Sequence, residues 1–139
     1  MIAIETIITR LQTIVPTYTI AKARSKEPDL AETAALPIIY VGYGTIDSKN
    51  PNQPIELDTY SMNGEDLVQS FDIQIVCKEI DLKTIWTATF KALIGWNPVT
   101  VEQMHSSMTY SQGGVIGISN DNIWWLDRYR IGFPTTIPL

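Results

Sequence analysis

An alternation of apolar and polar residues between Leu67 and Lys78 constrains the fold of this chain most. In an extended backbone, successive side chains point to opposite faces, so the apolar residues of this segment share one face: Phe71, Ile73, Ile75 and Cys77. The residues between them are mostly polar. One buried and one wetter face are typical of antiparallel sheets, so a second layer must cover the apolar face.

Two segments with helical periodicity can supply that layer. The first is predicted to end before Pro16 and has one apolar stripe: Ile4, Ile7, Ile8, Leu11, Ile14 and Val15. The second is predicted to begin with Asp81 as N-cap and to stop at Gly95, with this apolar side: Leu82, Ile85, Trp86, Phe90, Leu93 and Ile94. The order of elements predicts an α+β fold, a single domain with a mainly antiparallel β-sheet and two α-helices packed on one face.

The first half of the chain supplies two more predicted strands. Tyr18–Lys26 has the pattern of an edge strand, with basic side chains on one side: Lys22, Arg24 and Lys26. Pro37–Ile46 has the pattern of a strand whose two glycines permit a bulge.

The second half is predicted to complete the sheet. Residues 106–119 form one interrupted strand or two short ones that bend at Gly113-Gly114, and a tight turn at 119–122 leads into a strand over 123–133. We therefore expect one domain over residues 1–139, with a long loop at about 47–66 and an extended C-terminal tail at 134–139.

Composition argues against several classes of protein. The net charge of −5 argues against a dedicated nucleic-acid binder. The longest apolar run, Ala34–Val41, is broken by Pro37 and falls short of the ~20 residues that span a bilayer. No secretory leader is expected, and the single cysteine excludes an internal disulfide.

Chemistry-bearing residues are sparse. His105 is the single histidine, and it pairs with Cys77 as nucleophile and base only if the fold joins them. Cys77 is predicted to face the core as an inert thiol, and His105 to lie in a solvated loop. The carboxylates, Asp121 and Asp127 among them, lack calcium-loop spacing and are predicted to lie on the surface. We expect no catalytic residues, no metal and no cofactor.

The last strand and the long loop contain the candidate interface residues. Adjacent tryptophans in a strand face opposite sides, so one joins the core and the other covers a second face. Trp124 is predicted to share its face with Leu126, Arg128 and Arg130, a composition enriched at protein interfaces; solvated arginines over an exposed tryptophan are the alternative. In the long loop, the residues expected to pack on a neighbour are Ile55, Leu57, Tyr60 and Met62.

The layout resembles the tail terminator (tail completion) proteins of tailed bacteriophages. The similarity lies in the helix IETIITRL, the strand LPIIYVGYG, the alternating strand QSFDIQIVCKE, the helix end ALIGWNP and the last strand IWWLDRYRIGF. Together these segments extend over nearly the whole chain.

The resemblance implies a non-enzymatic structural virion protein at the head-proximal end of the tail, assembled in the host cytoplasm. It implies a homohexameric ring that caps the tail tube and docks the neck, with itself, the tail tube protein and a neck or connector protein as partners. DNA passes through such a ring without specific binding, and no membrane is involved. A head–tail connector or a tube-like ring subunit is the nearest alternative, and a small enzyme with an active site shared between subunits is another.

Overall fold

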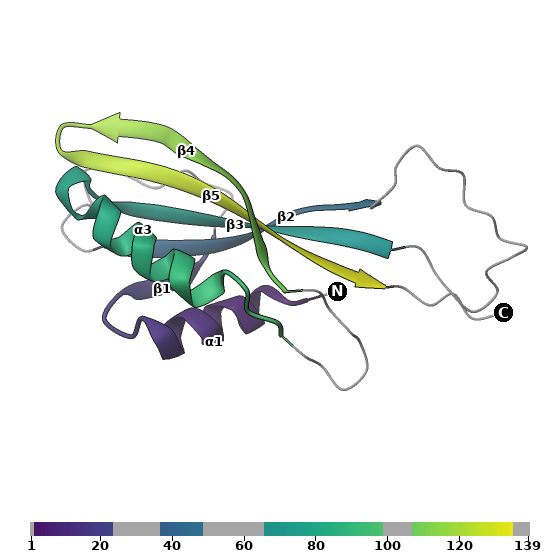
Figure 1. Ribbon diagram of the computed structural model, residues 1–139. Helices are drawn as coiled ribbons and strands as arrows, with labels where there is room; N and C mark the ends of the chain where they lie inside the picture. Colours follow the sequence, from purple (N-terminus) through teal and green to yellow (C-terminus); the bar gives the residue numbers. More distant parts are fainter. Residues whose placement is uncertain (1, 24–36, 49–65, 99–106, 135–139) are drawn as a thin grey trace, which may run out of the picture.

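The computed structural model describes residues 2–23, 37–48, 66–98 and 107–134. Two helices and five strands lie in this part of the chain, in the order α1 (Ile4–Ile14), β1 (Thr19–Lys22), β2 (Ile38–Ser48), β3 (Asp66–Lys78), α3 (Glu79–Leu93), β4 (Thr109–Ser119) and β5 (Asn122–Pro134). The strands form one sheet in the order β1-β2-β3-β5-β4. Both helices lie on one face of this sheet, and the ends of β2, β3 and β5 extend beyond them (Figure 1). The predicted α+β fold class is confirmed.

The strand pairing is antiparallel except at one edge. β3 pairs antiparallel with β2 and with β5, and β5 pairs antiparallel with β4. β1 pairs parallel with β2, although neighbouring strands were predicted to run antiparallel. The chain between Lys22 and Ile38 is long enough for the connection of roughly a dozen residues that parallel neighbours require.

The core forms where β3 meets the two helices. The four apolar residues predicted to face inward on β3 are fully buried, together with residues of both helices: Phe71, Ile73, Ile75, Cys77, Ile7, Leu11, Ile85 and Leu93. Ile14 and Ile94, which were predicted on the apolar stripes, are exposed. Ile14 is the last residue of α1, and Ile94 directly follows the end of α3.

The second helix begins earlier than predicted. α3 starts at Glu79, directly after β3, and Asp81 lies within its first turn. The Glu79 N–H donates a hydrogen bond to the Asp121 carbonyl, 2.7 Å away in the β4–β5 turn. This contact satisfies a helix N–H that otherwise needs a capping side chain. The predicted stop is confirmed at Gly95, whose φ of +74° suits a glycine after a helix.

Bulges occur in β2 and β4, the two strands in which glycines predicted a bulge or a bend. The register of β2 shifts between Tyr43 and Ile46, and that of β4 shifts on either side of the Gly113-Gly114 pair. Beyond its bulge β2 continues to pair with β3 through Asp47 and Ser48. The loop predicted at 47–66 is therefore shorter at both ends, because residue 66 also belongs to a strand.

Candidate subunit interface

β5 carries the four predicted interface residues of the last strand on a single face. The residues that alternate with them pack toward the helices: Ile123, Trp125, Asp127, Tyr129 and Ile131. The other face, opposite α1 and α3, therefore carries Trp124, Leu126, Arg128 and Arg130, and we call these four residues the β5 face. The structure brings them together as strand alternation predicted, while their contact with another subunit stays a prediction.

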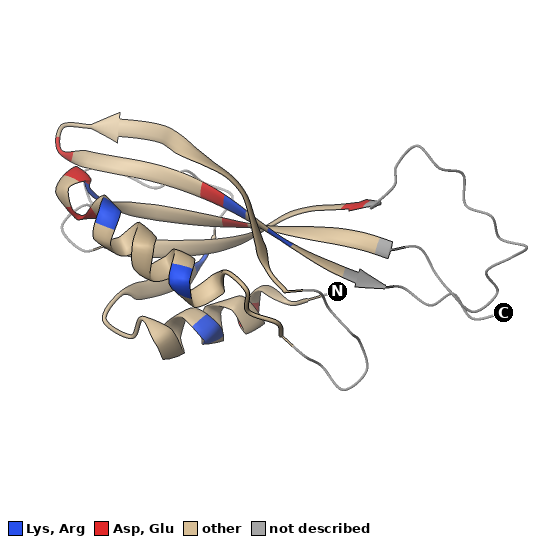
Figure 2. Cartoon of the chain, in the orientation of Figure 1, with Lys and Arg blue, Asp and Glu red and all other residues tan. Residues whose placement is uncertain are grey.

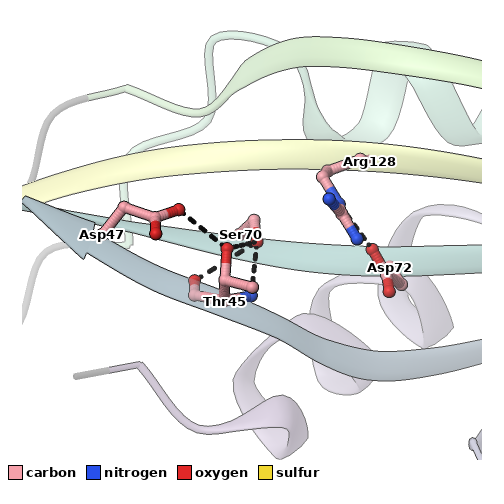
Figure 3. A network of polar contacts seen from close by, with 5 residues as sticks. All are labelled: Thr45, Asp47, Ser70, Asp72 and Arg128. Carbon is pink, nitrogen blue, oxygen red and sulfur yellow. Dashed lines mark hydrogen bonds and ion pairs between the residues drawn. The ribbon is translucent and has the colours of Figure 1, made fainter.

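An ion pair lies at the centre of the β5 face. The Arg128 Nε donates to Asp72 Oδ1 over 3.0 Å, and the two side chains are 29% and 20% exposed (Figure 3). The hydrogen bond with Asp72 raises the pKa of Arg128 above its ordinary value, so the guanidinium stays charged. Because the pair is partly buried and already formed, Arg128 is held in place before any partner arrives.

Trp124 is also held by a contact within the chain. Its indole Nε1 donates to Gln74 Oε1 over 3.3 Å, from β5 to the neighbouring β3. Val76, its partner in the β3–β5 register, is fully buried, and Leu126 is half-buried. Arg130, in contrast, is exposed. The face thus combines fixed apolar and polar groups with one exposed cation.

A second polar cluster fixes the bulge of β2 near this face (Figure 3). The Thr45 N–H donates to Ser70 Oγ over 2.7 Å, and the Thr45 hydroxyl donates to Asp47 Oδ2 over 2.8 Å. A Cβ at Gly44 would overlap the Ser70 hydroxyl, so this close approach of β2 and β3 requires glycine.

Asp127 was predicted as a surface carboxylate, and this prediction is wrong. Its side chain is fully buried on the helix-covered face, between Trp125 and Tyr129 in the chain. Oδ1 accepts hydrogen bonds from the Tyr110 hydroxyl over 2.8 Å and from the Trp125 indole N–H over 2.7 Å. Oδ2 has no partner among the described residues. The sequence contained a signal for this burial, because the alternation along β5 that places Trp124 on the outer face places Asp127 on the inner face.

Burial governs the protonation of this cluster. Burial raises the pKa of Asp127, although the hydrogen bonds from Trp125 and Tyr110 act to lower it. Burial also raises the pKa of Tyr110 to about 12, with the hydrogen bond to Asp127 contributing. The pKa of Tyr129 is raised for the same reason, mainly burial. Both tyrosines therefore remain protonated, and the Tyr110 hydroxyl serves as a donor to Asp127.

Two features that could mark an active site, an activated thiol and a cluster of metal ligands, do not occur among the residues that the structure describes. Cys77 is buried as predicted, and burial followed by the charge of Asp81 raises its pKa to about 11, so it is a thiol rather than a thiolate. No group of three potential metal ligands occurs among the described residues. His105 lies outside the described residues, and so whether it contacts Cys77 stays untested.

Other predicted residues fall partly outside the described ranges. The loop residues Ile55, Leu57, Tyr60 and Met62 lie outside them, as do Arg24 and Lys26. Lys22 lies on the edge strand β1, as predicted, and its Nζ is 3.4 Å from Glu5 Oε1 of α1. None of the helices in the described ranges is long and apolar enough to cross a membrane.

Comparison with known proteins identifies a shared fold. A chain in a solved structure entitled "Virion of native gene transfer agent (GTA) particle" matches with a TM-score of 0.56 and 16% sequence identity. The match covers 90% of this chain and 84% of that chain. No protein-family model matches the sequence, and no curated protein matches it. The nearly complete coverage of both chains means that the whole domain, rather than one motif, has a counterpart in that particle.

Proposed function

We propose that this chain is a structural virion protein that forms a ring on the tail tube of a phage-like particle and provides the attachment surface for the neck. The observation that carries the proposal is the match over most of both chains to a chain of a gene transfer agent virion. Fold analogy supports a class of function rather than a specific role, so the surfaces of the domain must supply the rest.

Two features of the surface support an assembly role. The β5 face presents a tryptophan and arginines, side chains enriched where proteins meet, together with a leucine. Its ion pair and its indole hydrogen bond are formed within the chain, so binding does not have to order these side chains. Cys77 is protonated and enclosed, which supports a non-enzymatic protein.

The role of tail terminator is our proposal within this class. It places the chain at the head-proximal end of the tail, as a hexamer assembled in the host cytoplasm, between the tail tube protein and a neck or connector protein. Two different surface patches of each copy join head to tail and close the ring. A ring of acidic subunits repels DNA phosphates, which suits a conduit that DNA must leave.

Electron micrographs of particles made without this chain test the role. We expect complete heads and tails that are not joined, with joining restored when the purified chain is added. Absence of any tail tube would instead identify a tube subunit, and heads that fail to retain DNA would identify a head-side connector. Light scattering of the purified chain tests the ring, with an expected mass of six times 15.6 kDa. A stable dimer would contradict it.

A further inference from the structure

The first turn of α3 exposes an isoleucine between two acids. Ile80 is 86% exposed, the highest exposure among the large apolar side chains that the structure describes. Glu79 and Asp81 flank it, are exposed and belong to the same first turn. Figure 2 shows acidic residues here and at the adjacent β4–β5 turn, where Asp121 lies. We call Glu79, Ile80 and Asp81 the acidic knob.

A pocket that contains one cation and one acid lies on the outer side of α1. It has a volume of about 470 Å³ and is lined by Glu5, Thr6, Thr9, Arg10, Thr13 and Trp96. The Arg10 guanidinium lies 5.3 Å from the centre of the Trp96 ring, and its Nε donates to the Ala92 carbonyl over 3.0 Å. We call this pocket the Arg10 socket.

The Arg10 socket is prepared for an acidic ligand with an apolar part. One Arg10 nitrogen is used by Ala92, and the two terminal nitrogens have no hydrogen-bond partner among the described residues. The half-buried Trp96 ring supplies an apolar wall beside this cation. The one acid of the socket, Glu5, is 3.4 Å from Lys22 and is therefore compensated.

The acidic knob and the Arg10 socket do not meet within one chain. Ile80 is in the first turn of α3, whereas Trp96 follows its last turn, and a helix of 15 residues is ~22 Å long. Both surfaces carry both signs of charge, since exposed Lys78 and Lys83 stand on either side of the acidic knob. The carboxylates of Glu79 and Asp81 match the Arg10 cation and Ile80 matches the Trp96 ring, which makes another copy of the same chain the fitting occupant. Contact between two different patches is head to tail, the geometry that generates rings.

We propose that the acidic knob of one copy inserts into the Arg10 socket of the next, with Ile80 against Trp96 and the flanking carboxylates beside Arg10. This contact rests on the proposed ring and names the surfaces that close it. It lies on the helix layer, and so it leaves the β5 face available to the tail tube or the neck.

Single-cysteine variants test the contact directly. Ile80→Cys and Thr9→Cys place reactive thiols in the acidic knob and the Arg10 socket, and both positions are exposed. The native Cys77 is buried, so the unaltered chain serves as the background control. Each variant is treated with a short bifunctional thiol crosslinker, alone and as a mixture, under conditions where light scattering reports the oligomer.

The mixture should give dimers that contain one copy of each variant, while either variant alone stays uncrosslinked. Crosslinking of Ile80→Cys with itself would show a symmetric contact and overturn the proposal. A ring in light scattering without mixed dimers would overturn this contact and leave the ring standing. A monomer at every concentration would overturn both the contact and the proposed ring.

A charge exchange gives a second readout. Arg10→Glu reverses the charge of the Arg10 socket and should lower the fraction of ring at least tenfold at a fixed concentration, because the new carboxylate faces Glu79 and Asp81. Combining it with Glu79→Lys and Asp81→Lys should restore the ring. Ile46→Ser, which alters an exposed isoleucine on β2 away from both surfaces, is the matched control and should assemble normally. Failure of the combined variant to assemble better than Arg10→Glu would contradict the pairing.

Discussion

Replacing Asp127 measures how the buried carboxyl holds β4 and β5 together beneath α3. Asp127→Ala removes the acceptor of two partly buried donors, the Tyr110 hydroxyl and the Trp125 indole N–H. An unsatisfied buried donor costs ~1–3 kcal/mol, so the loss of both bonds lowers the free energy of unfolding by at most about 2–6 kcal/mol, less the gain from removing a buried charge. Domains of this size have ~5–15 kcal/mol in total, so the loss is a large fraction of the stability.

Asp127→Asn separates the hydrogen bonds from the charge. The amide oxygen still accepts from Tyr110 and Trp125, while the side chain can no longer ionise. Burial raises the folded pKa of Asp127 above its ordinary value of 3.8. The carboxyl therefore stabilises the fold most below that value, and its contribution declines as the pH rises through the folded pKa. Asp127→Asn should remove this decline, and so its stability relative to the native chain should increase with pH.

Urea denaturation followed by tryptophan fluorescence, repeated over a series of pH values from about 4 to 8, measures both effects. The other carboxyl groups are common to both proteins, so their contributions cancel in the difference. An Asp127→Ala variant as stable as the native chain would refute the assignment of the two hydrogen bonds. A constant difference between Asp127→Asn and the native chain across the pH range would refute the assignment of a raised pKa.

Three further results are expected. Gly113→Ala should lower the free energy of unfolding by ~1–3 kcal/mol because a Cβ there overlaps Asp127 and the Tyr110 hydroxyl, whereas Gly114→Ala meets open space and should differ little in the same urea titration. Trp124→Ala should leave the far-ultraviolet circular dichroism intact and weaken binding to the tail tube or the neck by at least about 2 kcal/mol, and equal binding in a pull-down would remove it from the interface. Fluorescence anisotropy with a short labelled duplex should detect no binding at physiological salt, because the net charge is −5; salt-sensitive micromolar binding would contradict this.

Local sequence patterns predicted the parts of this protein that depend on backbone periodicity. The two-residue repeat of β3 identified its buried face, and the same repeat placed Trp124, Leu126, Arg128 and Arg130 on one side of β5. Helical spacing located both helices, and glycines located the bulges and the end of α3. These features follow from dihedral preferences and from the direction of each side chain, which near neighbours in the chain determine.

Local sequence patterns could not predict the contacts between segments that are far apart in the chain. The start of α3 depends on a carbonyl 42 positions later, at Asp121, and the pairing of β1 depends on where the chain returns after Lys22. Asp127 lies in the core, where Tyr110 and Trp125 donate to its Oδ1, although carboxylates are mostly found at the surface. The Arg10 socket forms because α1 packs beside the end of α3 and brings Arg10 over Trp96. Each of these depends on a hydrogen bond or a packing contact between residues far apart in the chain, and local periodicity carries no information about such partners.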